Sequence, residues 1–152
     1  MISFIITIYE NEAMTKEEAK QILKYHSYTN EDVNHPKMEK GFLGMLRPFS
    51  GKLIEENYHE VIEAIRTLAD ELRNGDEVDR EVISTIWGIC HLSRSWALEK
   101  DGMLRRNNLI NEEQIEQLEK WIESISYATM MILDGFDNAT AFEFYEDEKD
   151  KR

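Results

Sequence analysis

Hydrophobic residues recur at helical spacing in several stretches of the chain. The clearest lies between residues 54 and 74, where apolar side chains repeat every three or four positions and charged side chains fill the gaps. Its stripe comprises Tyr58, Val61, Ile62, Ile65, Leu68, Ala69 and Leu72. A second stripe comprises Ile115, Leu118, Trp121, Ile122, Ile125, Ala128, Thr129, Ile132 and Leu133. Both stripes predict amphipathic helices that bury one face.

Capping signals set the limits of these helices. Thr15 followed by Glu18 matches a capping box, and "NEEQ" at 111–114 offers a second N-terminal cap. Asp79 is a candidate cap for a helix between them, and Gly75 and Gly135 end the two amphipathic stripes. The pattern therefore predicts four main helices, over about 15–26, 54–74, 79–99 and 111–134.

Shorter elements fill the remaining chain. A helical turn is expected through Phe42 and Leu46, and a short helix after Asn138 would pin Phe142 and Tyr145 to the body. Residues 146–152 are expected to form a frayed, charged tail. Short connections between antiparallel helices predict an all-α fold, a compact helical bundle in which residues 1–152 form a single domain.

One segment stands apart because it carries no acid. The chain has 31 carboxylates, yet the segment from Val82 to Leu98 contains none, and its apolar residues surround a helical wheel on nearly every side. Such a helix belongs in the interior, where unpaired charge is costly. The sequence thus predicts a central helix at 82–98, with Trp87, Trp96 and Trp121 in or near the core. On this interpretation Trp87→Ala would be severely destabilising.

A narrow sector of that helix is small or polar, and it has two interpretations. Ser84, Gly88, His91 and Ser95 lie within about 60° of one another on the wheel. They could allow a neighbouring helix backbone to approach closely while His91 hydrogen-bonds to it. Alternatively, the small residues could form a pocket floor into which His91 projects. The first interpretation is favoured, so His91 is only a weak candidate for a catalytic residue.

The first thirteen residues suggest several roles. "MISFIITIYE" is too short and lacks the basic flank expected of a signal peptide or membrane anchor. It could be a packing arm. It could also be a non-native extension, because "MTKEEAKQ" at Met14 resembles a natural start that leads directly into a helix.

Net charge limits the classes of partner. The formal charge is −13, and a field of that sign repels nucleic acid and anionic lipid. Neither nucleic acid nor a membrane is therefore an expected partner, whereas a protein with a basic surface is. Cys90 is the only cysteine and is expected to be a buried filler. The lone cysteine and the lack of a signal peptide predict a cytoplasmic protein.

Positive charge is concentrated in two segments, 37–52 and 94–106, which together hold eight basic and three acidic residues. If they meet, the guanidinium groups of Arg47, Arg105 and Arg106 could bind a carboxylate or phosphate. Arg94, expected near the end of its helix, would pair with a carboxylate or join the ligand site. These arginines and His91 form the predicted ligand-binding set.

No motif for a cofactor, metal or nucleophile is convincing. Glu56 and His59 have the i, i+3 spacing used in di-metal bundles, but no second such pair occurs, and Glu56 and Glu60 are expected on the surface. No phosphate-binding loop or catalytic triad is recognisable. No cofactor and no metal site is therefore predicted.

Two functional hypotheses follow. The first is a small acidic interaction protein, such as an inhibitor or immunity-type module, that covers a basic partner surface. Carboxylates on the helices at 54–74 and 111–134 would steer its association. The second is a binder of a small anionic ligand, or an enzyme acting on one, that uses the Arg/His set. The first is favoured, and an enzymatic role is not expected.

Overall fold

The computed structural model describes residues 14–150, and every regular element in this range is helical. The four longest helices are α2 (Lys16–His26), α5 (Glu55–Asn74), α6 (Arg80–Ser93) and α8 (Glu112–Leu133). A π-helical turn, η1 (Arg94–Leu98), continues α6. The predicted all-α fold is confirmed, while the expectations for residues 1–13 lie outside the described residues. Within 14–150, no helix combines the length and apolar character needed to cross a bilayer.

The helix ends have the caps expected from the sequence. The hydroxyl of Thr15 accepts a hydrogen bond from the backbone N–H of Glu18 at 3.1 Å, and Asn111 accepts one from Gln114 at 2.8 Å. Both form complete capping boxes. The carboxylate of Asp79 accepts hydrogen bonds from the first turn of α6. These side chains satisfy backbone donors that would otherwise lack partners, which fixes where each helix begins.

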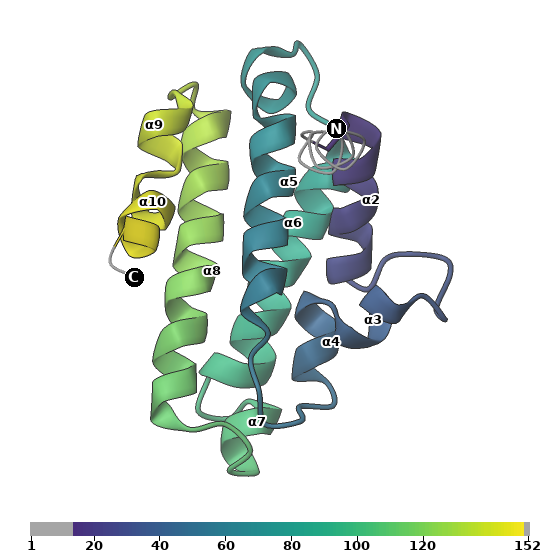
Figure 1. Ribbon diagram of the computed structural model, residues 1–152, viewed down its shortest axis with the longest axis vertical. Helices are drawn as coiled ribbons and strands as arrows, with labels where there is room; N and C mark the ends of the chain where they lie inside the picture. Colours follow the sequence, from purple (N-terminus) through teal and green to yellow (C-terminus); the bar gives the residue numbers. More distant parts are fainter. Residues whose placement is uncertain (1–13, 151–152) are drawn as a thin grey trace, which may run out of the picture.

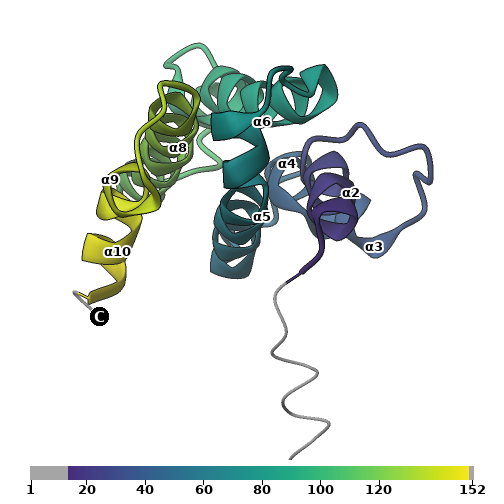
Figure 2. The same cartoon turned by 90° about the horizontal axis from the view of Figure 1, so that it is seen from above.

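The four long helices lie at the corners of a bundle. Helices α2 and α8 each pack against both α5 and α6, so α5 and α6 lie diagonally across the core (Figure 1, Figure 2). The predicted stripe of α5 is buried throughout. That of α8 is buried from Leu118 to Ile132, but the prediction for Leu133 is wrong, because this side chain is exposed.

The expectation that α6 is enclosed on every side is also wrong. Ile86, Ile89 and Cys90 are buried, but Trp87 is 72% exposed. The reason is geometric: four helices around one core leave each helix with an outward face, whatever its sequence. Trp96 is partly buried against the core and Trp121 is fully buried, so the prediction fails for Trp87 alone among the three tryptophans. Cys90 is the expected buried filler, and burial raises the pKa of its thiol to about 11.

Shorter helices pack around the four long ones (Figure 1). They are α3 (Pro36–Lys40), α4 (Phe42–Leu46), α7 (Met103–Arg106), α9 (Asn138–Ala141) and α10 (Glu143–Asp150). Helices α3 and α4 pack against α2, while α7 packs against η1. Phe142 and Tyr145 are buried as predicted. The predicted frayed tail is wrong up to Asp150, because these residues continue α10. Residues 151–152 lie outside the described range.

Aromatic rings from four helices meet in the core. The indole of Trp121 on α8 stacks on Tyr58 of α5 at a centroid distance of 5.2 Å. Phe42 of α4 meets the same indole edge to face at 6.2 Å. Tyr145 packs edge to face on Tyr58 at 5.4 Å, which attaches α10 to the cluster. Each ring removes a large apolar area from water, so this cluster is a main source of stability.

A polar network around a buried imidazole joins α2 to three further helices. His26 of α2 is 1% exposed, and its Nδ1 accepts the backbone N–H of Phe42 at 2.9 Å. Because Nδ1 is the acceptor, Nε2 carries the ring proton. This N–H group donates a hydrogen bond to Glu60 of α5, 2.9 Å away. The ammonium of Lys37 bonds to the same carboxylate oxygen. Glu60 is therefore part of a partly buried polar network, which corrects its expected place on the surface; Glu56 is exposed as expected.

This network shifts the titration of Glu60. Burial acts to raise the pKa of its carboxyl group, but the hydrogen bonds from His26 and Lys37 outweigh burial and lower the pKa to about 2. A carboxyl group with a depressed pKa stabilises the fold above its ordinary pKa, which here is 4.5, and that contribution is lost as pH falls toward 2.

Glu60→Gln tests this network. At neutral pH the variant should lose on the order of 2 kcal/mol of unfolding free energy, because the ionised partner of His26 and Lys37 is gone. The difference from the native chain should shrink as pH falls from 4.5 toward 2. Urea unfolding across this pH range measures it. Glu56→Gln, one turn earlier on the exposed face, is the control, and an equal pH dependence in both variants would contradict the assignment.

The two tryptophans give a second test of the fold. Trp121→Ala should lower the free energy of unfolding by about 3–5 kcal/mol, because it empties the centre of the aromatic cluster. Trp87→Ala should change it by less than about 1 kcal/mol, since the ring faces solvent. Chemical denaturation of dilute protein compares them. Similar losses in both variants would contradict the placement of Trp87 on the outward face.

Candidate functional site

Two of the predicted ligand-binding arginines, Arg94 and Arg105, are held by separate partners. Arg94 lies 3.3 Å from Glu123. Arg105 donates a hydrogen bond to the carbonyl of Leu98 at 2.9 Å and lies 3.9 Å from Glu112. Each guanidinium group therefore has a structural role at the end of the bundle where α6 and η1 meet α7 and α8.

The two basic segments do meet, but through a ring rather than a ligand cavity. The guanidinium of Arg47 lies 5.3 Å from the ring centroid of Trp96, a cation–π contact, and Arg106 is exposed. Neither of two surface hollows in the described range is lined by Arg47, Arg94, Arg105 or Arg106. A common ligand-binding role for these arginines stays a prediction.

Of the predicted site residues, His91 alone lines one of these two hollows. It is exposed on the outward face of α6, where a hollow of about 670 Å³ surrounds Trp87. The hollow is lined by Val78, Arg80, Ile83, Ser84, Trp87, Gly88, His91 and Leu92. No carboxylate is among them. We call these eight residues the α6 face.

The α6 face exposes much apolar surface for a chain of this charge. Trp87 stands out of the helix, Val78 is about half exposed, and Ile83 and Leu92 are partly buried beside them. An exposed tryptophan flanked by aliphatic side chains is typical of interaction surfaces. The helical wheel identified the sector of small and polar residues beside Trp87. It could not show that no neighbouring element covers Trp87.

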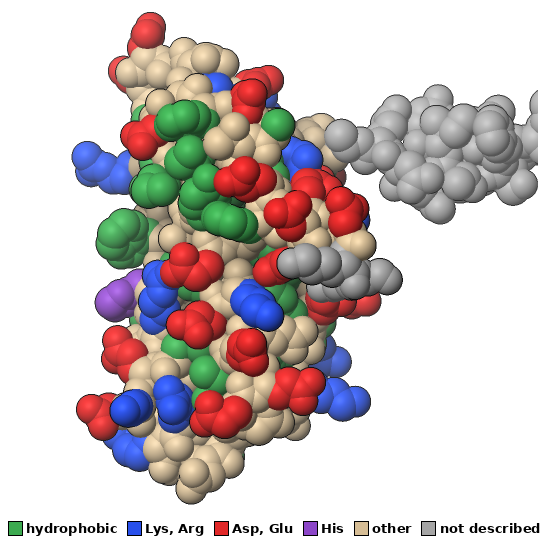
Figure 3. All heavy atoms as spheres, turned by 90° about the vertical axis from the view of Figure 1, so that its left-hand side faces the viewer, with side chains coloured by type: hydrophobic (Ala, Val, Ile, Leu, Met, Phe, Trp, Pro, Cys, Tyr) green, Lys and Arg blue, Asp and Glu red, His purple; other side chains and the backbone are tan. Residues whose placement is uncertain are grey.

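A second apolar surface lies at the C-terminal end of α8. Met130, Leu133, Phe136 and Phe144 are each between 41% and 52% exposed. We call these four residues the C-terminal patch. Figure 3 shows hydrophobic side chains gathered in the upper part of the face formed by α8, α9 and α10, with acidic side chains around them.

A run of four consecutive apolar residues in the sequence indicates this patch. Residues 130–133 are Met, Met, Ile and Leu, and four consecutive positions span about 300° of a helix. They cannot all face one core. Met131 and Ile132 pack inward, whereas Met130 and Leu133 face solvent. The ring centroids of Tyr127 and Phe144 lie 4.6 Å apart, and this contact links α8 to α10 beside the patch.

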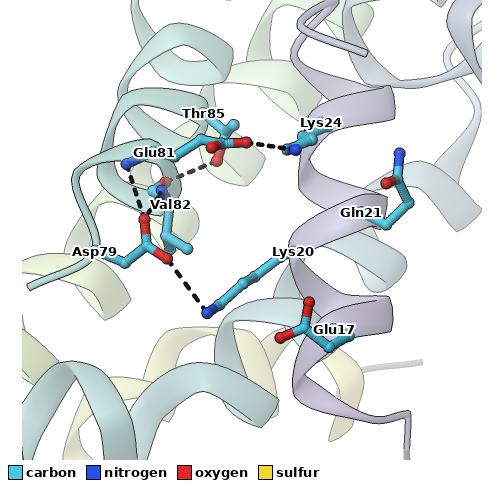
Figure 4. A pocket seen from close by; sticks show the side chains of 8 residues that line it. All are labelled: Glu17, Lys20, Gln21, Lys24, Asp79, Glu81, Val82 and Thr85. Atoms are coloured by element: carbon cyan, nitrogen blue, oxygen red, sulfur yellow. Dashed lines mark hydrogen bonds and ion pairs between the residues drawn. The ribbon is translucent and has the colours of Figure 1, made fainter. Parts of the chain in front are cut away.

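Both lysines in the cleft between α2 and α6 are paired with carboxylates (Figure 4). This cleft, of about 190 Å³, contains Lys20 at 3.2 Å from Asp79 and Lys24 at 2.6 Å from Glu81. The hydrogen bond to Asp79 raises the pKa of Lys20. Burial acts to raise the pKa of Asp79, but the bond to Lys20 and the backbone N–H groups of Val82 and Glu81 together outweigh burial and lower that pKa. The ion pairs across this cleft thus join α2 to the start of α6.

The histidine of the Glu-x-x-His pair on α5 has a structural contact. The Nδ1 atom of His59 lies 2.7 Å from the hydroxyl of Tyr145 on α10, and Glu56 is exposed. Tyr58, beside it, lies 3.2 Å from Glu148 through its hydroxyl, and burial raises the pKa of that phenol. Within residues 14–150, no three histidine, cysteine, aspartate or glutamate side chains are grouped as a metal site.

Comparisons with protein-family models, curated proteins and solved structures find no match for the chain.

Proposed function

We propose that this chain is a protein-interaction module that binds a partner with a basic surface at the C-terminal patch. The observation that carries the proposal is the gathering of four large hydrophobic side chains, about half exposed, at one end of α8 and in the segments that follow it. Isolated exposed hydrophobics are ordinary, but a cluster of aromatic and methionine side chains favours protein contacts.

Charge around the patch supports a basic partner. Asp134, Asp137, Glu143 and Asp147 are exposed within the same part of the chain. A net charge of −13 would steer a positively charged protein toward the molecule, and the apolar side chains would then hold it. This division of roles suits an inhibitor or immunity-type module that covers a basic surface.

Site-specific photocrosslinking tests the proposal. The full chain, carrying benzoylphenylalanine at Leu133, is exposed to light in extracts of the cells that produce it. The expected result is an adduct with a different protein of basic surface, identified by mass spectrometry. Its yield should fall as salt is added, because salt screens the attraction between opposite charges.

Two controls make the result specific. The same crosslinker at Lys120, an exposed position in the first half of α8, should give no such adduct. Asp134→Asn together with Asp147→Asn should reduce the yield at Leu133 without unfolding the chain. Equal yields at the two positions, or a yield that neither salt nor the double variant changes, would contradict the proposal.

A further inference from the structure

The outward face of α6 carries a glycine, and no close packing within the described residues explains its lack of a side chain. Gly88 lies in the middle of α6, and a Cβ added there would meet no atom within 4 Å. Glycine in a helix interior costs up to about 1 kcal/mol relative to alanine. By contrast, a Cβ at Gly41 would lie 2.2 Å from the carbonyl oxygen of Lys37, so close packing explains that glycine. Gly88 has no such explanation within the described residues.

A large side chain stands next to this gap. Trp87 and Gly88 are consecutive residues, so they lie at nearly the same height on the helix and about 100° apart around it. Ser84 and His91 lie on the line between them. The α6 face therefore has a projecting ring on one side of its midline and an empty position on the other.

A two-fold axis parallel to α6 exchanges the two sides. Such an axis places two copies of the helix side by side in the same direction, with Ser84 and His91 of each copy along the midline. Trp87 of each copy then lies over Gly88 of the other, where the missing side chain leaves room. An isologous interface of this kind uses the same surface of both copies. The contact of Trp87 with the open position at Gly88 therefore occurs twice.

The same axis brings opposite charges together. Arg80 and Glu81 stand two helical turns before Trp87 and Gly88 and flank the midline in the same order. Arg80 of one copy therefore lies beside Glu81 of the other, on both sides of the axis. The carboxylate of Glu81, bonded to Lys24, is 59% exposed, and the exposed Arg80 has no carboxylate within salt-bridge distance in the described range.

Net charge also favours this face for contact between copies. Two chains of charge −13 repel each other at most orientations, but the eight residues that line the α6 face include no carboxylate, and Glu81 at its edge is paired with Lys24. We infer that the α6 face binds a second copy of this chain to form a parallel, two-fold symmetric homodimer in which Trp87 packs on Gly88 of the partner copy. This surface differs from the C-terminal patch, so the inference goes beyond the proposed function.

Sedimentation velocity over a concentration series tests the inference with the full chain. The native protein should pass from monomer to dimer as concentration rises. Trp87→Ala should weaken the dimer by about 30-fold or more, the loss typical of a tryptophan at the centre of an interface. A protein that remains monomeric throughout the series, or a dimer that Trp87→Ala does not weaken, would overturn the inference.

Substitutions at Gly88 separate association from folding. Gly88→Ala should raise the stability of the dilute monomer, since alanine favours helix and meets no neighbour, while it weakens the dimer. Gly88→Leu should weaken the dimer further and leave the circular dichroism spectrum helical. If neither variant changes the dimer constant, Gly88 does not receive the ring of Trp87 and the inference fails.

Cysteine crosslinking tests the orientation of the two copies. Ser84→Cys should form a disulfide-linked dimer under mild oxidation, because this position lies near its own counterpart on a parallel axis. Cys90 is buried and should stay unreacted. Ser50→Cys, at an exposed position away from α6, is the control. An antiparallel dimer would instead link Ser84→Cys to His91→Cys in a mixture of the two variants, which would overturn the parallel arrangement.

The two proposals can fail independently. Trp87→Ala and Gly88→Leu leave the C-terminal patch intact, so they should not abolish the photocrosslink at Leu133. Loss of that photocrosslink without loss of the dimer contradicts only the proposed function. An absent dimer with a normal photocrosslink at Leu133 contradicts only the homodimer.

Discussion

The central constraint on this structure is the outward face of α6, which is apolar and is left uncovered by the bundle. The helix is apolar on nearly all sides, but a bundle of four helices covers only the sides that face its core. Ile86 and Ile89 point inward and are buried, whereas Trp87 points outward and is not. Because no other described element lies over it, the chain carries an apolar surface that its own fold does not satisfy. The homodimer is one consequence of this imbalance.

Electrostatic pairing organises the rest of the molecule. His26, Lys37 and Glu60 form a network that joins α2, α3 and α5, and the lysines of α2 pair with the carboxylates at the start of α6. Basic residues are therefore used largely to hold helices together. Within residues 14–150, many exposed carboxylates form no salt bridge with a basic side chain, and this excess supports a partner of positive charge for the C-terminal patch.

Helix positions followed closely from local sequence, because their signals are local. A capping box needs only residues three apart, and a buried stripe needs only its own periodicity. The buried stripe of α5 and the capping boxes of Thr15 and Asn111 therefore matched expectation. The role of Glu60 did not, since its partners His26 and Lys37 come from distant positions in the chain.

The sequence by itself determined the class of fold, the limits of the long helices and the strong negative charge. Only the tertiary structure decided which sides of those helices meet water. An apolar residue such as Trp87 has the same position on a helical wheel whether or not a neighbouring helix covers it. Its exposure depends on how many helices surround it, which is a property of the packed bundle. The partners of Arg47 and Arg94 have the same origin, because Trp96 and Glu123 come from distant positions in the chain.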